Sequence, residues 1–320
     1  AQDPQVLSHN FRTSTKIVTI SNGILKLREN FLTNEKVSIQ VSHEEGPKPV
    51  LIYLDKGSRN NIDPSLIDEL FTNKSNYKVL SRKSDDEGVE ELLKDDLLSN
   101  ERIKSNHNIM TVTEIKGGEH ENIILYRAGE IKVDALNSLL KSKQELAGLD
   151  HESKMALKFI VNQLYILTTR STKRMYIIEQ DRHKGRIWEQ LFSEDLEIAD
   201  DPGTQIKNLL TIASEDFDLE TYAKDQLRYF DETSNRKFLK WIKDAFESAN
   251  PSEINKKTAR ELLNRASALD SELDGNFEQA GDHWMKANLF RLAFGCYVQA
   301  KKWAKARETN FKDVKRFDKT

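Results

Sequence analysis

The fold is decided by the stretch ESKMALKFIVNQLYILTTRSTKRMYII, which covers residues 152–178. Over residues 152–168 the apolar side chains recur every three or four positions, which is the spacing of one helix face. The apolar run that begins at Met175 and ends at Ile178 then predicts a buried strand. A helix that leads into an apolar strand is typical of a parallel α/β sheet, because parallel strands need crossover connections.

The residues before this stretch repeat the same alternation. Further buried strands are predicted at residues 49–54, 77–80, 109–113 and 122–126. Helices are predicted over 14–32 and 63–71, and Lys116 and the two glycines after it predict a turn. We therefore expect an α/β domain with helices on both faces of a parallel sheet, and we expect 174–178 to be its last strand.

An acidic segment interrupts this pattern at about residues 83–106. It contains eight Asp and Glu residues between positions 85 and 101, with leucines and a valine among them. A solvated helical insert is the simplest interpretation of such a segment. A calcium-binding loop would need regularly spaced oxygen ligands around a central glycine, and the segment lacks that spacing.

Strand patterns stop near residue 200, and residues 201–203 (Asp-Pro-Gly) mark a boundary. Helical spacing continues to the end, and from about residue 251 small residues alternate with large aromatic ones. This alternation predicts closely packed, tetratricopeptide-like repeats, although a plain helical bundle also fits. The predicted organisation is a foreign leader at 1–5, an α/β domain at 6–200 and an all-α domain at 201–320.

Composition excludes several classes of protein. The chain has 320 residues, with 49 Lys and Arg against 52 Asp and Glu, so its net charge is −3 and a generally basic coat is absent. No apolar run approaches the ~20 residues that span a bilayer, and no secretory signal is present. The single Cys296 cannot form an internal disulfide. We expect an intracellular protein, cytoplasmic or nuclear, without a membrane anchor or a resident metal.

Three polar segments lie beside the ends of predicted elements, at residues 9–14, 110–119 and 162–174. Sites in open parallel sheets form outside the carboxyl ends of the strands, so Arg12, Glu119 and Arg170 are expected to converge there. Two converging arginines suit a phosphate, because the guanidinium fork matches phosphate oxygens. Taken singly, each arginine has the simpler interpretation of a surface or salt-bridge residue.

In this order the three segments resemble the motifs of the C-terminal half of superfamily 1 helicases of the UvrD/Rep type. Residues 10–13 (Asn-Phe-Arg-Thr) are similar to motif IV, residues 111–119 to motif V, and residues 164–170 to motif VI. The resemblance covers about residues 6–182 and implies a second RecA-like motor domain. The helical tail resembles the large tetratricopeptide- and ankyrin-repeat proteins that carry such a module.

The resemblance also implies roles for individual residues around a bound nucleotide. Phe11 takes the position of the aromatic residue that stacks on adenine, Glu119 takes the position of the acid that meets the ribose hydroxyl, and Gly117 is counted among the nucleotide-binding residues. Arg12 and Arg170 take the positions of the catalytic arginines that reach the γ-phosphate. An arginine there stabilises the charge that develops during phosphoryl transfer.

For nucleic acid, the resemblance implies that Thr111 and Thr113 contact the backbone of a single strand of DNA or RNA. Motif V departs from the family pattern here, because Thr113 replaces a histidine, Gly118 a leucine and His120 a phenylalanine. The contact with nucleic acid is therefore less well supported than the contact with nucleotide. Residues 301–320 hold eight Lys and Arg against three Asp and Glu, which indicates either a nucleic-acid footprint or a solvated terminal helix.

No GxxxxGK[ST] phosphate-binding loop occurs in the sequence, and no convincing acidic metal ligand accompanies one. The chain is therefore expected to be a fragment that supplies half of an ATP cleft, with ATP and Mg²⁺ bound only in a complete protein. We expect it to be inactive alone as an ATP hydrolase. Two alternatives remain: a decayed, helicase-like scaffold that binds protein partners through its helical domain, and a regulatory tail that docks on a separate motor domain.

Overall fold

A computed structural model of the chain describes residues 9–10, 13–29, 39–42, 44–54, 62–72, 77–83, 85–94, 98, 100–116, 118–141, 145–146, 148–180, 182–183, 185–215, 218–249, 251–254 and 256–309. The chain forms two compact units, Ala1–Asp216 and Phe217–Thr320. The sequence predicts the division earlier, at residue 200. The difference comes from helix α10 (Pro202–Glu215), which contributes Ile206, Leu209 and Leu210 to the core of the first unit.

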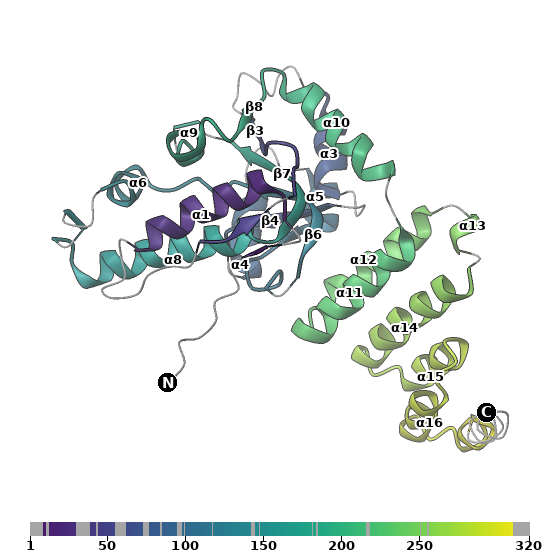
Figure 1. Ribbon diagram of the computed structural model, residues 1–320. Helices are drawn as coiled ribbons and strands as arrows, with labels where there is room; N and C mark the ends of the chain where they lie inside the picture. Colours follow the sequence, from purple (N-terminus) through teal and green to yellow (C-terminus); the bar gives the residue numbers. More distant parts are fainter. Residues whose placement is uncertain are drawn as a thin grey trace. The chain divides into compact units, whose positions relative to one another are not determined.

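The first unit contains a sheet of six strands, all of them parallel. In chain order the strands are β3 (Val50–Tyr53), β4 (Tyr77–Ser81), β5 (Ile109–Met110), β6 (His120–Tyr126), β7 (Ser171–Glu179) and β8 (Glu197–Ile198). Their order across the sheet is β5-β4-β6-β7-β3-β8 (Figure 1). A separate parallel pair joins β1 (His9–Asn10) to β2 (Val41–Ser42).

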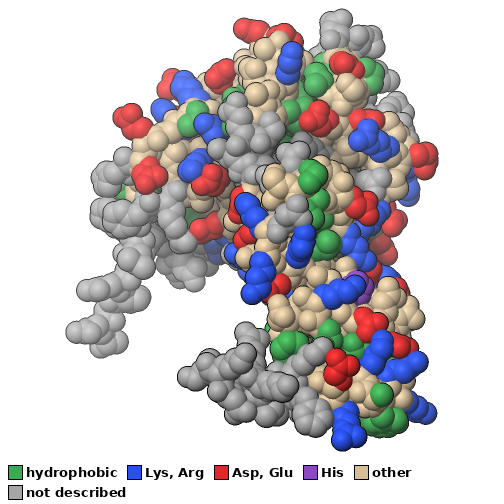
Figure 2. All heavy atoms as spheres, turned by 90° about the vertical axis from the view of Figure 1, so that its right-hand side faces the viewer, with side chains coloured by type: hydrophobic (Ala, Val, Ile, Leu, Met, Phe, Trp, Pro, Cys, Tyr) green, Lys and Arg blue, Asp and Glu red, His purple; other side chains and the backbone are tan. Residues whose placement is uncertain are grey.

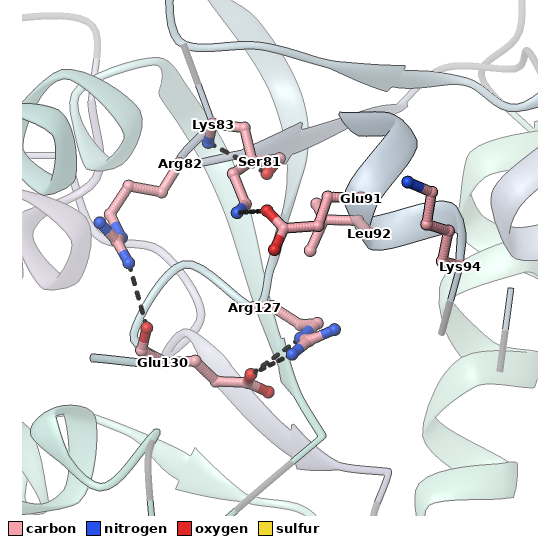
Figure 3. Close-up of a pocket in the computed structure, with 8 residues that line it drawn as sticks. All are labelled: Ser81, Arg82, Lys83, Glu91, Leu92, Lys94, Arg127 and Glu130. Carbon is pink, nitrogen blue, oxygen red and sulfur yellow. Dashed lines mark hydrogen bonds and ion pairs between the residues drawn. The ribbon is translucent and has the colours of Figure 1, made fainter. Parts of the chain in front are cut away.

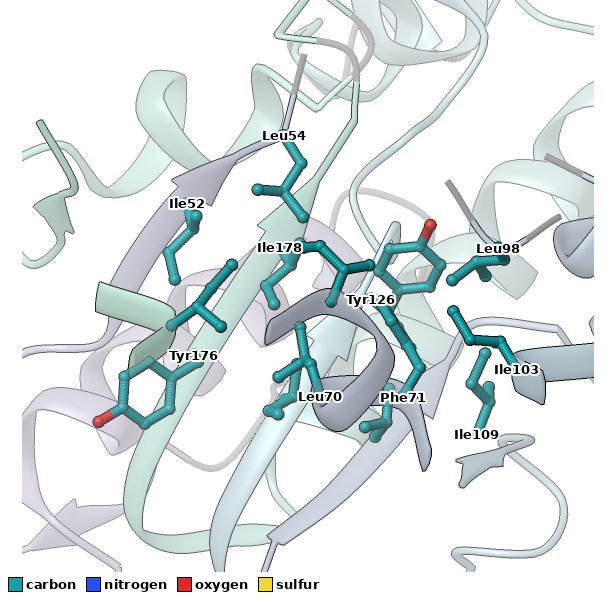
Figure 4. Close-up of a cluster of buried hydrophobic side chains, with 14 of the residues drawn as sticks. Ile52, Leu54, Leu70, Phe71, Leu98, Ile103, Ile109, Tyr126, Tyr176 and Ile178 are labelled. Atoms are coloured by element: carbon teal, nitrogen blue, oxygen red, sulfur yellow. The ribbon is translucent and has the colours of Figure 1, made fainter. Parts of the chain in front are cut away.

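Helices cover both faces of the sheet, as the sequence predicts (Figure 1). One face carries α3 (Pro64–Thr72), α4 (Asp86–Leu93), α5 (Glu101–Asn106) and α10; the other carries α1 (Thr15–Glu29), α6 (Val133–Leu139), α8 (His151–Thr168) and α9 (Ile187–Phe192). Successive side chains of a strand point to opposite faces. Tyr126 and Ile178 accordingly join Leu70 and Phe71 in the apolar cluster under α3, where the rings of Phe71 and Tyr126 lie 4.7 Å apart (Figure 4).

Helix α8 and strand β7 account for the stretch that opened the sequence analysis. The helix begins after Asp150, whose carboxylate accepts a hydrogen bond of 2.8 Å from the backbone N–H of Ser153 and caps the first turn. Its buried face packs against α1, where Ile17, Ile20 and Ile24 have no exposed surface. Only Thr169 and Arg170 separate α8 from β7, so the helix ends at the amino end of the strand.

Two strand predictions are wrong in detail. Strand β7 is not the last, because β8 follows and pairs with β3 at the edge of the sheet. The strand predicted at 109–113 ends at Met110, and turns occupy 112–116. Thr111 and Glu114 explain that end: Glu114 Oε2 accepts hydrogen bonds from the Thr111 N–H and hydroxyl, and Thr111 Oγ1 accepts one from the Glu114 N–H. This reciprocal pairing is the capping box that starts a helical turn.

The second unit is helical throughout its described residues. Its helices are α11 (Leu219–Thr233), α12 (Lys237–Ser248), α13 (Pro251–Ile254), α14 (Lys257–Leu273), α15 (Phe277–Lys286) and α16 (Phe290–Gln299). A further helical segment covers 303–309. The last three helices begin at 277, 290 and 303, so each helix with its turn takes roughly 13 residues. A pair of such helices is shorter than the 34 residues of a tetratricopeptide repeat.

The turns of this array share one geometry. Gly275, Asn288 and Lys301 all have left-handed φ, at 72°, 59° and 56°. The residue after each donates a backbone hydrogen bond to the carbonyl five positions earlier, for example Asn276 to Ser271 at 2.8 Å. This Schellman arrangement satisfies the last carbonyls of each helix.

Close packing between α15 and α16 depends on Gly281. A Cβ at this position would lie 2.6 Å from Cε1 of Tyr297. The alternation of small and aromatic residues therefore lets successive helices approach, as the sequence analysis expects. Cys296 lies in the same cluster, and burial together with Glu272 raises the pKa of its thiol to about 12, so it is a packed thiol and not a nucleophile.

On the face drawn in Figure 2, basic and acidic side chains are interspersed, with apolar side chains scattered among them. That face therefore has no large region of a single charge sign. None of the helices built from the described residues has the length and apolar character needed to cross a bilayer. Within the same residues no cluster of three His, Cys, Asp or Glu side chains is placed to hold a metal ion.

Candidate functional site

Four of the seven predicted site residues lie in described parts of the chain: Thr111, Thr113, Glu119 and Arg170. The other three, which are Phe11, Arg12 and Gly117, lie outside the described residues. The backbone beside the first two of these is placed: the N–H of Ser14 donates a 3.1 Å hydrogen bond to the carbonyl of Thr172. The residue that follows the segment 10–13 is therefore joined to the start of β7.

Arg170 ties the other two motif segments together at the same place. Its Nη1 donates to the carbonyl of Gly118 at 3.1 Å, and its own carbonyl accepts from the N–H of His120 at 2.9 Å. The exposed Glu119 lies between these two partners. Residues 14, 118 and 170, which are far apart in the sequence, thus meet at one edge of the sheet.

That edge is the amino edge, and the expectation of a site at the carboxyl edge is wrong for these residues. Glu119 immediately precedes β6 and Arg170 immediately precedes β7, and His120 and Ser171 are paired in the sheet. The rule for open sheets concerns the loops that follow strands, whereas these two residues come before strands. The guanidinium of Arg170 also donates to the carbonyl of Ile166 at 3.1 Å and to Thr169 Oγ1 at 3.3 Å, so its plane is fixed by three protein acceptors.

Thr111 and Thr113 lie at the opposite edge, because they follow the carboxyl end of β5. Thr111 is only 2% exposed, and its hydroxyl is engaged with Glu114, so this side chain shapes the turn and does not face solvent. Thr113 is exposed. Between them, the N–H of Val112 donates a 3.0 Å hydrogen bond to the carbonyl of Lys83, which joins this turn to the loop after β4.

The carboxyl edge also contains a pocket that sequence reasoning missed. The strand order reverses between β4 and β6, because β4 leads outward to β5 whereas β6 leads to β7 on the other side. The two crossover connections lie on opposite faces of the sheet there, which leaves a crevice where ligands of open α/β sheets bind. A cavity of about 360 Å³ occupies this point, lined by Ser81, Arg82, Lys83, Glu91, Leu92, Lys94, Arg127 and Glu130 (Figure 3).

Cations outnumber carboxylates in this pocket by two. Lys83 Nζ lies 2.7 Å from Glu91 Oε2, and the hydrogen bond that it donates lowers the pKa of the Glu91 carboxyl. Arg127 makes a forked contact with Glu130, with Nε and Nη2 at 2.8 and 2.7 Å from Oε2. Each carboxylate of the pocket therefore already has a basic partner.

Arg82 is held differently, by backbone carbonyls. Its Nε donates to the carbonyl of Ala128 at 3.1 Å. Its Nη2 donates to the carbonyl of Glu130 at 3.0 Å, as Figure 3 shows. Nη1 reaches the side-chain carbonyl of Gln163 on α8 at 3.4 Å. Carbonyl partners orient the guanidinium without cancelling its charge, so Arg82 remains an attractive centre for an anion.

Arg127 stands in the left-handed region, at φ 51°. A non-glycine residue there costs about 1 kcal/mol or more, and such strain tends to persist at functional sites. The signal available in the sequence was the position of these residues. Arg82 and Lys83 lie two and three residues after the strand predicted at 77–80, and Arg127 directly follows the one at 122–126.

Comparisons with known proteins give no family assignment: no protein-family model matches the chain, and no curated protein matches it. The candidate site consequently depends on its geometry. It has two parts at opposite edges of one sheet, which are the motif edge around Arg170 and the cationic pocket at the ends of β4 and β6.

Proposed function

We propose that the first unit is the second motor domain of an ATP-dependent nucleic-acid helicase or translocase. In this proposal Arg170, together with Arg12, enters an ATP cleft that another domain completes with a phosphate-binding loop and a Mg²⁺ ligand. The observations that carry the proposal are two hydrogen bonds at one edge, from Ser14 to Thr172 and from Arg170 to Gly118, because they bring the residue after the motif IV-like segment and the motif V-like and motif VI-like segments close together.

Single-stranded nucleic acid is proposed to cross the opposite edge. The pocket there offers cations to backbone phosphates, which are the groups that dominate affinity for nucleic acid. The exposed Thr113 lies on a turn that is hydrogen-bonded to Lys83, so the motif V contact and the pocket form one surface. Thr111 is assigned a positioning role in this surface, because it is buried in its pairing with Glu114.

Such an arrangement would separate nucleotide and nucleic acid by the length of a strand. A seven-residue strand such as β6 spans about 20 Å, at roughly 3.3 Å per residue. A movement forced on the amino edge by ATP would therefore be carried by the rigid sheet to the carboxyl edge. This separation suits a motor, in which one ligand is hydrolysed while the other is moved.

The proposal is tested by ATP hydrolysis of the full-length gene product, measured with and without single-stranded DNA and RNA. We expect nucleic acid to stimulate hydrolysis and Arg170→Ala to lower kcat by roughly 10³-fold or more, the usual effect of losing such an arginine. The control is Lys173→Ala, which removes an exposed cation that pairs with Glu121 at the same edge.

The 320-residue chain alone should not turn over ATP, because its sequence has no phosphate-binding loop. Turnover by this chain that disappears in Arg170→Ala would contradict the half-cleft assignment. Absence of ATP hydrolysis by the full-length product under all conditions would contradict the proposal that the first unit is a motor domain.

The second candidate is a scaffold whose nucleotide chemistry has decayed. The observation that favours it lies in the helical unit, where Leu292, Phe294 and Trp303 are 49%, 41% and 64% exposed on the repeated helices. Exposed large apolar side chains on one array suit a protein partner. This candidate predicts an inactive full-length product together with partner binding that is lost when Trp303 is replaced by Ser.

A further inference from the structure

Glu179 is a fully buried carboxyl behind the cationic pocket, at the end of β7. Its Oε1 accepts two hydrogen bonds of 2.7 Å, one from the backbone N–H of Gly129 and one from Nε1 of Trp188 on α9. Its Oε2 is buried and has no hydrogen-bond partner among the described residues. One oxygen therefore accepts two hydrogen bonds, and the other is buried without one.

Close packing prevents this carboxyl from turning toward solvent. A Cβ at Gly185 would lie 2.8 Å from Glu179 Cγ, and a Cβ at Gly129 would lie 2.1 Å from Nε1 of Trp188 and 2.9 Å from Glu179 Oε1. At both positions only glycine lets the backbone come this close to the side chains of Glu179 and Trp188. A charge formed on Glu179 could not be relieved by a small rotation of its side chain.

The loop after β6, residues 128–130, contacts both Glu179 and Arg82. Gly129, which donates to Glu179, lies between Ala128 and Glu130, whose carbonyls accept the hydrogen bonds from Arg82. The N–H of Gln180, the residue after Glu179, donates to Glu130 Oε1 at 2.9 Å. Glu179 and its neighbour therefore fix the wall of the pocket on the β6 side.

The ionisable side chains around Glu179 come from three elements. They are Glu130 and Arg127 from the loop after β6, Arg82 from the loop after β4, and Tyr53 from β3. Burial is the largest influence and raises the pKa of Glu179 to about 8; Glu130 acts in the same direction, and the hydrogen bonds and Arg127 act against it. The carboxyl is therefore neutral at pH 7.

We propose that phosphate binding in the pocket and protonation of Glu179 are coupled, so that the pocket binds nucleic-acid backbone tightly only while Glu179 is neutral. This inference rests on the proposed nucleic-acid contact at the carboxyl edge. A carboxylate formed behind Arg82 would repel a phosphate through protein, with little water to screen it. By linkage, a bound phosphate would in turn favour the protonated form of Glu179.

The experiment measures binding of a tetramethylrhodamine-labelled oligodeoxyadenylate to the chain between pH 6.5 and 8.8. This probe is chosen because neither its phosphodiesters nor its bases titrate in this range. For the wild type we expect roughly four- to fivefold weaker binding at the alkaline end, because a tenfold coupling between the two sites is only partly expressed at pH 8.8 when the pKa of Glu179 in the unbound protein is about 8. Glu179→Gln should bind equally well throughout, because the amide keeps an acceptor oxygen and cannot ionise.

The matched control is Glu197→Gln, which removes an exposed carboxyl at the far edge of the same sheet and should retain the wild-type pH profile. Identical profiles in the wild type and Glu179→Gln would overturn the coupling and leave the nucleic-acid contact intact. Absence of binding at every pH in all three proteins would overturn the nucleic-acid contact and the coupling with it.

A measurement on the wild type alone keeps the inference testable if Glu179→Gln fails to fold. Calorimetric titration of the oligonucleotide at pH 8, in two buffers with different heats of ionisation, reports the protons taken up on binding. We expect net uptake approaching half a proton, because Glu179 is about half ionised at that pH in the unbound protein. Binding without proton uptake would overturn the coupling.

Discussion

The replacement of Glu179 by Gln is expected to stabilise the first unit at neutral pH. In the folded protein burial raises the pKa of Glu179 to about 8, whereas the ordinary value of 4.5 applies to the unfolded chain. Between these values the folded state holds one more proton than the unfolded state, so the free energy of unfolding falls as the pH rises. The fall begins near pH 4.5 and levels off above pH 8.

The size of this loss of stability follows from the difference between the pH of the measurement and the pKa of Glu179 in the unfolded chain. At pH 7 the free energy of unfolding is about 3 kcal/mol lower than below pH 4.5, because it falls by about 1.36 kcal/mol for each pH unit above 4.5. The amide introduced by Glu179→Gln would keep the acceptor for Gly129 and Trp188 but would not titrate. Wild type and variant should therefore be similar near pH 5, and the variant should be about 3 kcal/mol more stable at pH 7.

Hydrogen exchange of the β6 and β7 amides, measured by mass spectrometry at pH 5, 7 and 8.5, tests this prediction within the first unit alone. The protection of these strands reports the free energy of opening their unit. Glu197→Gln is the control, because it removes an exposed carboxyl from the same sheet. If wild-type stability does not change between pH 5 and 8, or if the variant follows it, the reasoning about the buried carboxyl is refuted.

Three other changes test the packing. Gly129→Ala should lower Tm and weaken binding at the pocket, at a cost of roughly 2 kcal/mol, because the new Cβ would meet Nε1 of Trp188 at 2.1 Å. Phe71→Ala should cost about 3–5 kcal/mol in urea unfolding, since its ring is fully buried against Tyr126. Lys301→Gly should raise the thermal stability of the helical unit by about 1 kcal/mol, because φ is 56° there and glycine adopts it without strain.

Most strands of the sheet were predictable because they are apolar runs, β4 with its buried Lys78 being an exception in composition, and the longer covering helices α1 and α8 were predictable from their apolar spacing. Strand β8 was missed because its two residues are exposed at the edge of the sheet and carry no apolar run. The strand at 109–113 was extended too far because Thr111 and Val112 are β-branched, although Thr111 and Glu114 also form a capping box. The hydrogen bonds between Thr111 and Glu114 therefore outweigh the strand propensity of these residues.

The site was predictable only in part. The meeting of the motif segments was expected, and their placement at the amino edge follows from the sequence itself, since Glu119 and Arg170 precede apolar runs. Glu179 could not have been found in this way. It follows Ile178 as a charged residue that ends a strand, which usually indicates solvent, but Gly129, Gly185 and Trp188 pack around it in the folded chain.

One physical connection links the two edges directly. Gln163 lies on α8, about 8 Å from the helix end at Thr168 at 1.5 Å per residue, and Arg170 follows that end by two residues. Gln163 accepts the hydrogen bond from Arg82 at the pocket, and Arg170 holds the motif edge through the carbonyl of Gly118. A shift of α8 along its axis would therefore disturb both contacts together, whereas a shift of the loop after β4 would disturb only the first. If ATP moves Arg170, the helix can carry that movement to Arg82 without any change in the sheet, and the pocket proposed to bind phosphate would sense the nucleotide through the side chain of Gln163.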